Sequence, residues 1–222
     1  MKWNLKTTPL YFLFMFLLPM HIQAQWYAGA SYGETNVETE RVDQQDFTIT
    51  PAFIIWEDSD TANKAFVGWR ATPALAIEFG YADLGKYTWR SENPSFQEGT
   101  VFEPTAAFGE FVAQFDLGSG WYFLAKLGLA YWDAEVTYQN SNGGFTDKGS
   151  KSDVDPLLGL GFEYRPPRSS IPLYYRFEWE QFQNVGEGLS YLVDTPAEVE
   201  ELNGQDINVL SITFIYDFDV SH

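Results

Sequence analysis

The sequence predicts an all-β fold, an eight-stranded antiparallel up-and-down transmembrane β-barrel, and three observations point to it. Large apolar residues alternate with small or charged ones in segment after segment, and a period of two indicates a strand with two unlike faces. Aromatic residues make up 18% of the chain, which suits strands packed against an apolar medium. Short and long connections alternate between these segments, as in barrels with turns on one side of a membrane and loops on the other.

The first 24 residues have the features of a secretory signal peptide. Lys2 and Lys6 form a basic start, residues 9–20 form an apolar stretch too short to span a bilayer comfortably, and Ala24 is a small residue at a cleavage position. The alternatives are a buried N-terminal helix or a membrane anchor. We therefore expect residues 1–24 to be a signal peptide and residues 25–222 to form the barrel domain.

Eight strands are expected in the barrel domain, each with one large apolar face and one small or polar face. The predicted strands are Trp26–Thr35, Ser59–Ala71, Ala74–Trp89, Val101–Leu117, Trp121–Tyr138, Asp153–Arg165, Pro172–Asn184 and Asp206–Phe218. Strands of about 9 to 11 residues span a bilayer when tilted. An even number of strands closes the sheet and leaves no unpaired edge, which hydrocarbon requires.

The connections between these strands are of two kinds. Three are short, at residues 72–73, 118–120 and 166–170, and the others are long and polar, at residues 36–58, 90–100, 139–152 and 185–205. The first long connection also holds the apolar residues Phe47, Ile49 and 53–56. Such residues either extend the neighbouring strands as a hairpin above the membrane or form an adhesive surface.

Alternation alone also fits a soluble β-sandwich, which hides its apolar faces between two sheets. The signal peptide, the aromatic content and the strand lengths favour the membrane barrel, in which the apolar faces point to lipid and the polar faces point inward.

Several charged residues fall on the inward register of the strands and form the candidate site. They are Glu78, Glu110, Lys126, Glu163, Arg176, Glu178 and Glu180. Ionised groups inside a narrow barrel have to be paired or hydrated. Five Glu face Lys126 and Arg176, with Arg70 as a possible third cation, so the network is expected to be short of cations. It acts either as a structural plug, which we favour, or as a gate in an ion path.

Composition excludes several functions. A net charge of -18 argues against binding to nucleic acid, and the lack of cysteine excludes disulfides and cysteine-based sites. The only histidines are His21, in the signal peptide, and His222, after the last strand, so a His-dependent mechanism has no candidate within the barrel. Glu178 and Glu180 have the chemistry for glycoside hydrolysis, but Arg176 beside them favours the inward network. No enzyme activity, cofactor or metal is expected.

Several segments resemble the OmpA-like outer-membrane β-barrel family: residues 58–85, 125–131, 159–164, 176–182 and 210–218. The last of these is similar to the closing strand of the family, whose aromatic residues, here Tyr216 and Phe218, signal to the barrel-assembly machinery. Two departures stand out: Thr213 occupies a position where Gly is usual, and residues 219–222 follow Phe218. From the resemblance we expect a small barrel without the peptidoglycan-binding domain of longer family members.

The resemblance implies a location in the outer membrane of a Gram-negative bacterium. It implies outer-membrane lipid and lipopolysaccharide as partners, with periplasmic chaperones and the assembly machinery during biogenesis, and a monomeric barrel. In the family an interior charge network blocks a continuous pore. The function implied is a structural role in envelope integrity or an interaction at the cell surface, and the alternative is a small pore for ions or small solutes.

Overall fold

The computed structural model describes residues 25–38, 54–57, 59–91, 98–140, 145–167, 171–194, 198–202 and 204–218. The predicted signal peptide, the apolar residues Phe47, Ile49 and Phe53, and His222 lie outside this part of the chain. Within it, no helix is long and apolar enough to cross a membrane.

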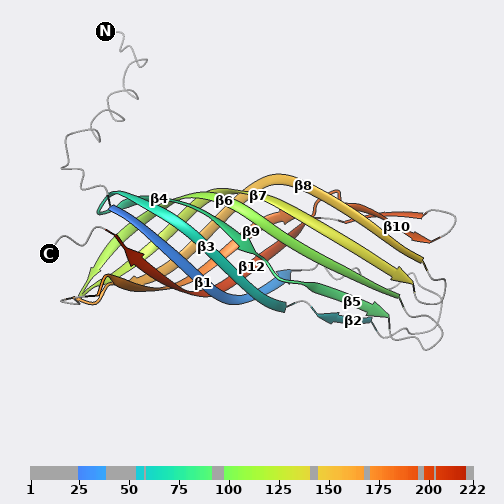
Figure 1. Ribbon diagram of the computed structural model, residues 1–222, viewed down its shortest axis with the longest axis horizontal. Helices are drawn as coiled ribbons and strands as arrows, with labels where there is room; N and C mark the ends of the chain where they lie inside the picture. The colour runs from blue at the N-terminus through green and yellow to red at the C-terminus, as the bar shows by residue number, and fades with distance from the viewer. Residues whose placement is uncertain are drawn as a thin grey trace, which may run out of the picture.

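Eight antiparallel strands form a closed ring, so the predicted fold class is confirmed (Figure 1). The strands of the wall are β1 (Gln25–Glu38), β3 (Ser59–Thr72), β4 (Leu75–Asp83), β6 (Glu98–Gly118), β7 (Trp121–Asn140), β8 (Phe145–Tyr164), β9 (Leu173–Val185) and β12 (Gln205–Asp217). Their order around the ring is β6-β4-β3-β1-β12-β9-β8-β7, and the pairing of β6 with β7 closes it. β1 pairs with β12, so the first and last strands of the ring are neighbours.

Four shorter strands lie at one end of the wall. β5 (Tyr87–Ser91) pairs with the start of β6 and β2 (Ile54–Glu57) pairs with β5, so these two extend the sheet of the wall. β10 (Ser190–Asp194) forms a hairpin with β11 (Glu198–Glu201), which is a separate two-stranded sheet. Ile54–Glu57 therefore extends the sheet as a strand, one of the two alternatives for the first long connection. β6, β7 and β8 are 20 or 21 residues long, whereas β9 and β12 have 13, so one side of the wall is taller.

Two of the predicted strands differ clearly from the observed ones, and the bounds of the others agree within three residues. The strand expected at Ala74–Trp89 is interrupted between β4 and β5, where Gly85 has a φ of 90° and its N–H donates to Asp83 Oδ1 at 3.1 Å. The strand expected to begin at Asp153 begins at Phe145. Residues 146–152 are polar on both faces, so alternation does not reveal a strand there. The backbone of β7, which pairs with β8 along its whole length, sets this boundary instead.

The two ends of the barrel differ. The strand ends that flank the turns between β3 and β4, β6 and β7, and β8 and β9 lie together at what we call the short-turn end. The strand ends that the longer connections join lie at the opposite, long-loop end (Figure 1). The first and last described strands both reach the short-turn end, where Phe218 N donates to Trp26 O at 3.0 Å.

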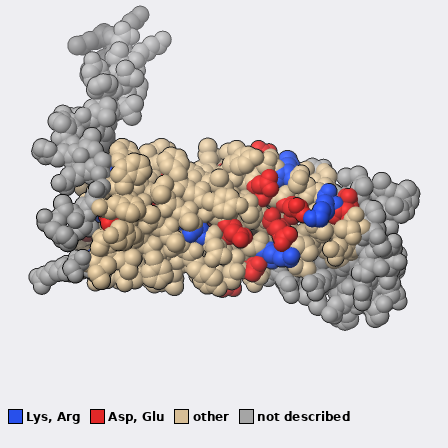
Figure 2. Space-filling model, in the orientation of Figure 1, with Lys and Arg blue, Asp and Glu red and all other residues tan. Residues whose placement is uncertain are grey.

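The outer face is apolar around the short-turn half of the wall. Large side chains such as Phe111, Leu127 and Leu210 are 60% to 66% exposed. Aromatic rings pair across neighbouring strands, with Trp121 and Tyr164 4.8 Å apart between centroids. On the face shown in Figure 2, charged side chains gather toward the long-loop end, and the short-turn half is mostly uncharged. Because the apolar faces point outward from a closed ring, the β-sandwich alternative is excluded.

Candidate functional site: the charged lumen

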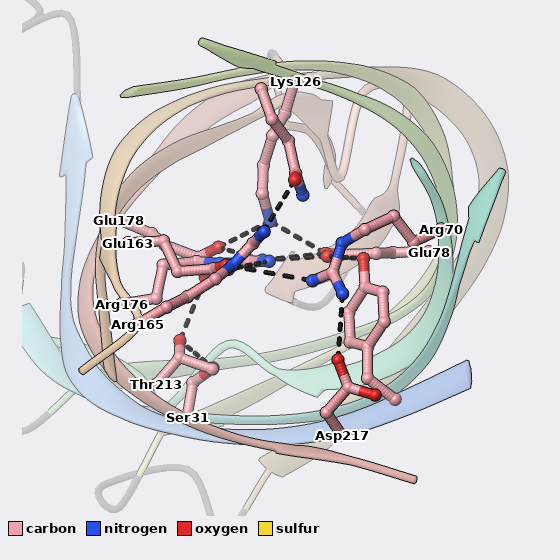
Figure 3. Close-up of polar contacts among 12 residues, drawn as sticks. Ser31, Arg70, Glu78, Lys126, Glu163, Arg165, Arg176, Glu178, Thr213 and Asp217 are labelled. Atoms are coloured by element: carbon pink, nitrogen blue, oxygen red, sulfur yellow. Dashed lines mark hydrogen bonds and ion pairs between the residues drawn. The ribbon is translucent and has the colours of Figure 1, made fainter. Parts of the chain in front are cut away.

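All seven predicted site residues lie in the lumen of the barrel, on five different strands. β4 carries Glu78, β6 carries Glu110, β7 carries Lys126, β8 carries Glu163, and β9 carries Arg176, Glu178 and Glu180. All seven are buried. The period of two explains their common direction, because residues two apart on a strand point to the same face. Figure 3 shows five of these side chains, those of Glu78, Lys126, Glu163, Arg176 and Glu178, pointing from the wall toward the barrel axis.

Lys126 occupies the centre of the network. Its Nζ lies within 2.6 to 3.1 Å of carboxylate oxygens of Glu78, Glu110, Glu178 and Glu180. An ammonium group has three N–H donors, so these four carboxylates share them. Glu110 is the least well paired: its Oε1 lies 2.8 Å from Lys126 Nζ, while its buried Oε2 has no hydrogen-bond partner.

Arg176 holds three carboxylates together. Its guanidinium lies 2.7 Å from Glu163 Oε2, 2.9 Å from Glu78 Oε1 and 2.9 Å from Glu178 Oε1. These carboxylates belong to β8, β4 and β9, so one side chain links opposite walls of the barrel (Figure 3).

Sequence reasoning missed Lys64, which lies on β3 and is buried. Its Nζ lies 2.9 Å from Glu178 Oε2 and also pairs with Glu180. The signal was present in the sequence, because Lys64 shares the inward register of Phe66, Gly68 and Arg70.

The shortage of cations is therefore smaller than the sequence predicts, because Lys64, Arg70 and Arg165 also join the network. Arg70 Nη1 pairs with Asp217 at 3.0 Å, and Arg165 Nε pairs with Glu163 at 2.5 Å. The network contains five cations and six carboxylates: Lys64, Arg70, Lys126, Arg165 and Arg176 against Glu78, Glu110, Glu163, Glu178, Glu180 and Asp217.

Hydroxyl groups complete the network. Tyr27 donates to Glu78 Oε1 at 2.6 Å, and its ring fits only because Gly68 has no side chain: an added Cβ would lie 2.1 Å from Tyr27 Cζ. Thr213 donates to Glu178 Oε2 at 3.0 Å and lies 2.7 Å from the Ser31 hydroxyl. The threonine that replaces the usual glycine of the closing strand therefore contributes a bond to the lumen.

A second, apolar layer fills the lumen toward the long-loop end. Its largest fully buried members are Trp132, Tyr87, Phe102, Phe182, Leu84, Leu157, Leu189 and Ile207. Gly186, with a φ of 83°, brings the chain close to the Phe102 ring, and the Tyr87 and Phe102 rings lie 6.1 Å apart. Between the two layers, a cavity of about 10 Å³ lined by Lys64, Ser211 and their neighbours has room for one water molecule.

The structure thus has a closed ring of strands, an outward apolar face and inward charges. The sequence also matches a known family. The sequence matches the OmpA-like transmembrane domain over residues 21–219. The chain belongs to this family. Its fold is that of an outer-membrane β-barrel, and the OmpA-like domain accounts for every strand of the ring.

This OmpA-like chain is similar to solved structures of other outer-membrane proteins at low sequence identity. Outer membrane protein AlkL in lipid bilayers aligns with a TM-score of 0.52 and 11% identity, covering 92% of this chain and 95% of that one. Neisserial surface protein A aligns at 0.48 and 12% identity, over 88% and 99% of the two chains. The outer membrane protease OmpT from Escherichia coli aligns at 0.47 and 8% identity, over 90% and 99%. A search of curated proteins gives no match.

The residues assigned to assembly lie on the outer face of this OmpA-like barrel. Tyr216 and Phe218 are exposed, and their rings lie 5.4 Å apart. In the part of the chain that the structure describes, no group of His, Asp or Glu residues is arranged to hold a metal ion. The chemistry that the lumen provides is mutual neutralisation of buried charge.

Proposed function

We propose that this OmpA-like barrel is a closed, non-enzymatic protein of the outer membrane with a structural role in the envelope or an interaction role at the cell surface. The observation that carries the proposal is the double filling of the lumen. A layer of paired charges and a layer of packed apolar side chains lie one above the other along the barrel axis.

The charged layer ties the wall together across the lumen. Lys64 on β3 and Lys126 on β7 both pair with Glu180 on β9, and Arg176 on β9 pairs with Glu78 on β4. Removing one partner from a buried ionic network costs about 3 to 5 kcal/mol, because the remaining charge loses its compensation. Such a network favours a rigid, filled interior over a path for solutes.

The proposal that the protein is not an enzyme rests on the burial of the candidate catalytic groups and on their pairing with other side chains. Glu178 and Glu180 are almost completely buried and each pairs with two or more cations, so neither is free to act as an acid or base on a substrate. The Ser31 hydroxyl forms a hydrogen bond with the Thr213 hydroxyl inside the same closed layer, so it is not free to act on a substrate either. The described residues contain no histidine.

The proposed location and partners follow from the features of the sequence and of the outer face. Residues 1–24 serve for export and are removed, Tyr216 and Phe218 present the assembly signal, and the exposed apolar belt contacts outer-membrane lipid and lipopolysaccharide as a monomer. Outer-membrane barrels of this size carry outward apolar bands flanked by aromatic residues, which supports this assignment.

Conductance of the refolded protein in a planar bilayer tests the proposal. We expect no sustained current from the wild type or from Arg176→Ala, because the apolar layer still closes the lumen. The double variant Arg176→Ala with Phe102→Ala, which thins both layers, should conduct and shows that the assay detects an open barrel. A sustained wild-type current that changes in Arg176→Ala would favour the alternative function, a small pore.

A further inference from the structure

A cavity of about 370 Å³ opens at the short-turn end of the barrel, where it borders the charged layer at Arg165. Its lining includes Tyr122, Arg165, Pro166, Pro167, Ile171 and Tyr174. This volume lies within the range of small-ligand sites, which are mostly apolar with a few polar groups directed into them. Neither the charged layer nor the apolar layer explains it.

Arg165 is held in a fixed position beside this cavity. Its Nε donates to Glu163 Oε1 at 2.5 Å and its Nη2 donates to Gln114 Oε1 at 2.7 Å. The Tyr122 ring lies 4.1 Å from the guanidinium carbon and the Tyr174 ring 5.5 Å from it. Figure 3 shows the Arg165 side chain reaching from the wall into the barrel. The protein thus orients the guanidinium through its Nε and Nη2 atoms.

Three polar groups of the lining remain available to a ligand. Among the described residues, Arg165 Nη1 has no hydrogen-bond acceptor, and the hydroxyls of Tyr122 and Tyr174 have no partner. All three can donate a hydrogen bond.

Some donor atoms of the residues behind the cavity also lack a hydrogen-bond acceptor. Arg70 Nε and Nη2 and Gln114 Nε2 are buried donors without a hydrogen-bond partner. Gln114 bonds Arg165 directly, and Arg70 Nη2 lies 3.8 Å from Glu163, the carboxylate that Arg165 also contacts. Buried donors are normally paired, so this end of the lumen is short of acceptor oxygens.

We propose that this cavity binds a small organic carboxylate. The carboxylate supplies the missing acceptor oxygens to Arg165 Nη1 and the tyrosine hydroxyls, and guanidinium–carboxylate bonds are short and strong. The tyrosine rings and the prolines pack against the apolar body of the ligand. A singly charged anion fits better than a phosphate dianion, because Glu163 and Asp217 lie nearby and repel the second charge. The site is separate from the proposed function, because it requires no conduction and no contact outside the cell.

Calorimetric titration of detergent-refolded protein with benzoate tests the site, with benzamide as the neutral probe of the same shape. We expect benzoate to bind in the millimolar range and benzamide about tenfold more weakly or worse, because it lacks the charge-assisted bond. Arg165→Gln should lose affinity for benzoate by a similar factor. Lys148→Gln, which changes an exposed lysine far from the cavity, should leave it unchanged.

A heat-modifiable gel shift establishes that each variant has folded. Tyr174→Phe removes only a hydroxyl group, so it carries the test if Arg165→Gln does not refold, and it should weaken benzoate binding severalfold. Equal binding of benzoate and benzamide, unchanged affinity in folded Arg165→Gln or in Tyr174→Phe, or binding of inorganic phosphate as tight as that of benzoate would each overturn the assignment.

Discussion

Arg176 and Glu110, two charged residues of the lumen, differ in how many ion-pair partners they have. Arg176 pairs with three carboxylates, and Glu110 contacts one lysine and leaves one oxygen unpaired. The described network also holds one carboxylate more than it has cations. Loss of a shared cation therefore leaves several buried carboxylates without a compensating charge. Loss of the Glu110 charge instead makes the numbers of cations and carboxylates in the network equal.

We expect Arg176→Ala to lower the free energy of unfolding by about 3 to 5 kcal/mol. Glu110→Gln, which keeps the shape of the side chain and removes its charge, should cost markedly less. Urea unfolding of both refolded variants, followed by tryptophan fluorescence, measures the difference. Equal urea midpoints for the two variants would contradict the arrangement of charges described here.

At the scale of residues, the sequence predicts well which side chains point into the lumen, and it predicts poorly which of them form ion pairs with one another. The period of two places Glu78, Lys126 and Arg176 in the lumen without knowledge of the structure. It does not give their partners, because these depend on the register between strands that are far apart in the chain. Asp217 and Arg70 meet across the β1 strand that separates β3 from β12, a contact that spacing along the chain does not reveal.

At the scale of elements, the long strands β7 and β8 and the hairpin of β10 and β11 determine the shape of the long-loop end. β10 lies against β8 and β7. At this contact Gly149 of β8 leaves no room for a side chain, since an added Cβ would lie 2.2 Å from Ser190 O. The sequence predicts the eight strands of the ring because lipid imposes alternation there. It does not predict the polar start of β8 or the hairpin, because water accepts polar residues on both faces.

Gly149→Ala should displace the hairpin of β10 and β11, because the nearest atom to the new methyl group is a backbone oxygen that cannot turn away. We expect faster proteolytic cleavage in residues 186–204 of the refolded protein, with little change in the ring itself. Ser150→Ala, at the exposed neighbouring position, is the matched control. Identical cleavage rates in both variants would show that the hairpin does not depend on this contact.

At the scale of the whole molecule, the face shown in Figure 2 divides along the barrel axis into an apolar half and a half that carries charge. β8 crosses both, so one strand allows a controlled comparison. Leu160→Arg places a charge in the apolar half and should cost about 2 to 4 kcal/mol. Thr146→Arg, exposed near the long-loop end of the same strand, should cost little. Equal unfolding free energies of the two variants in lipid vesicles would contradict a membrane boundary along the barrel.

The orientation of the barrel in the membrane follows from the difference between its ends. Outer-membrane barrels place short turns in the periplasm and longer loops outside the cell.

The chain has no cysteine, so a single engineered thiol reports one position. Ser190 is exposed at the start of β10, and Ser119 is exposed in the turn between β6 and β7, where its φ of 55° already suits a turn. On intact cells, Ser190→Cys should react with a membrane-impermeant maleimide and Ser119→Cys should not; both should react after the outer membrane is permeabilised, which controls for buried thiols. Labelling of Ser119→Cys alone on intact cells would show that the barrel has the opposite orientation, with the cavity beside Arg165 at the cell surface.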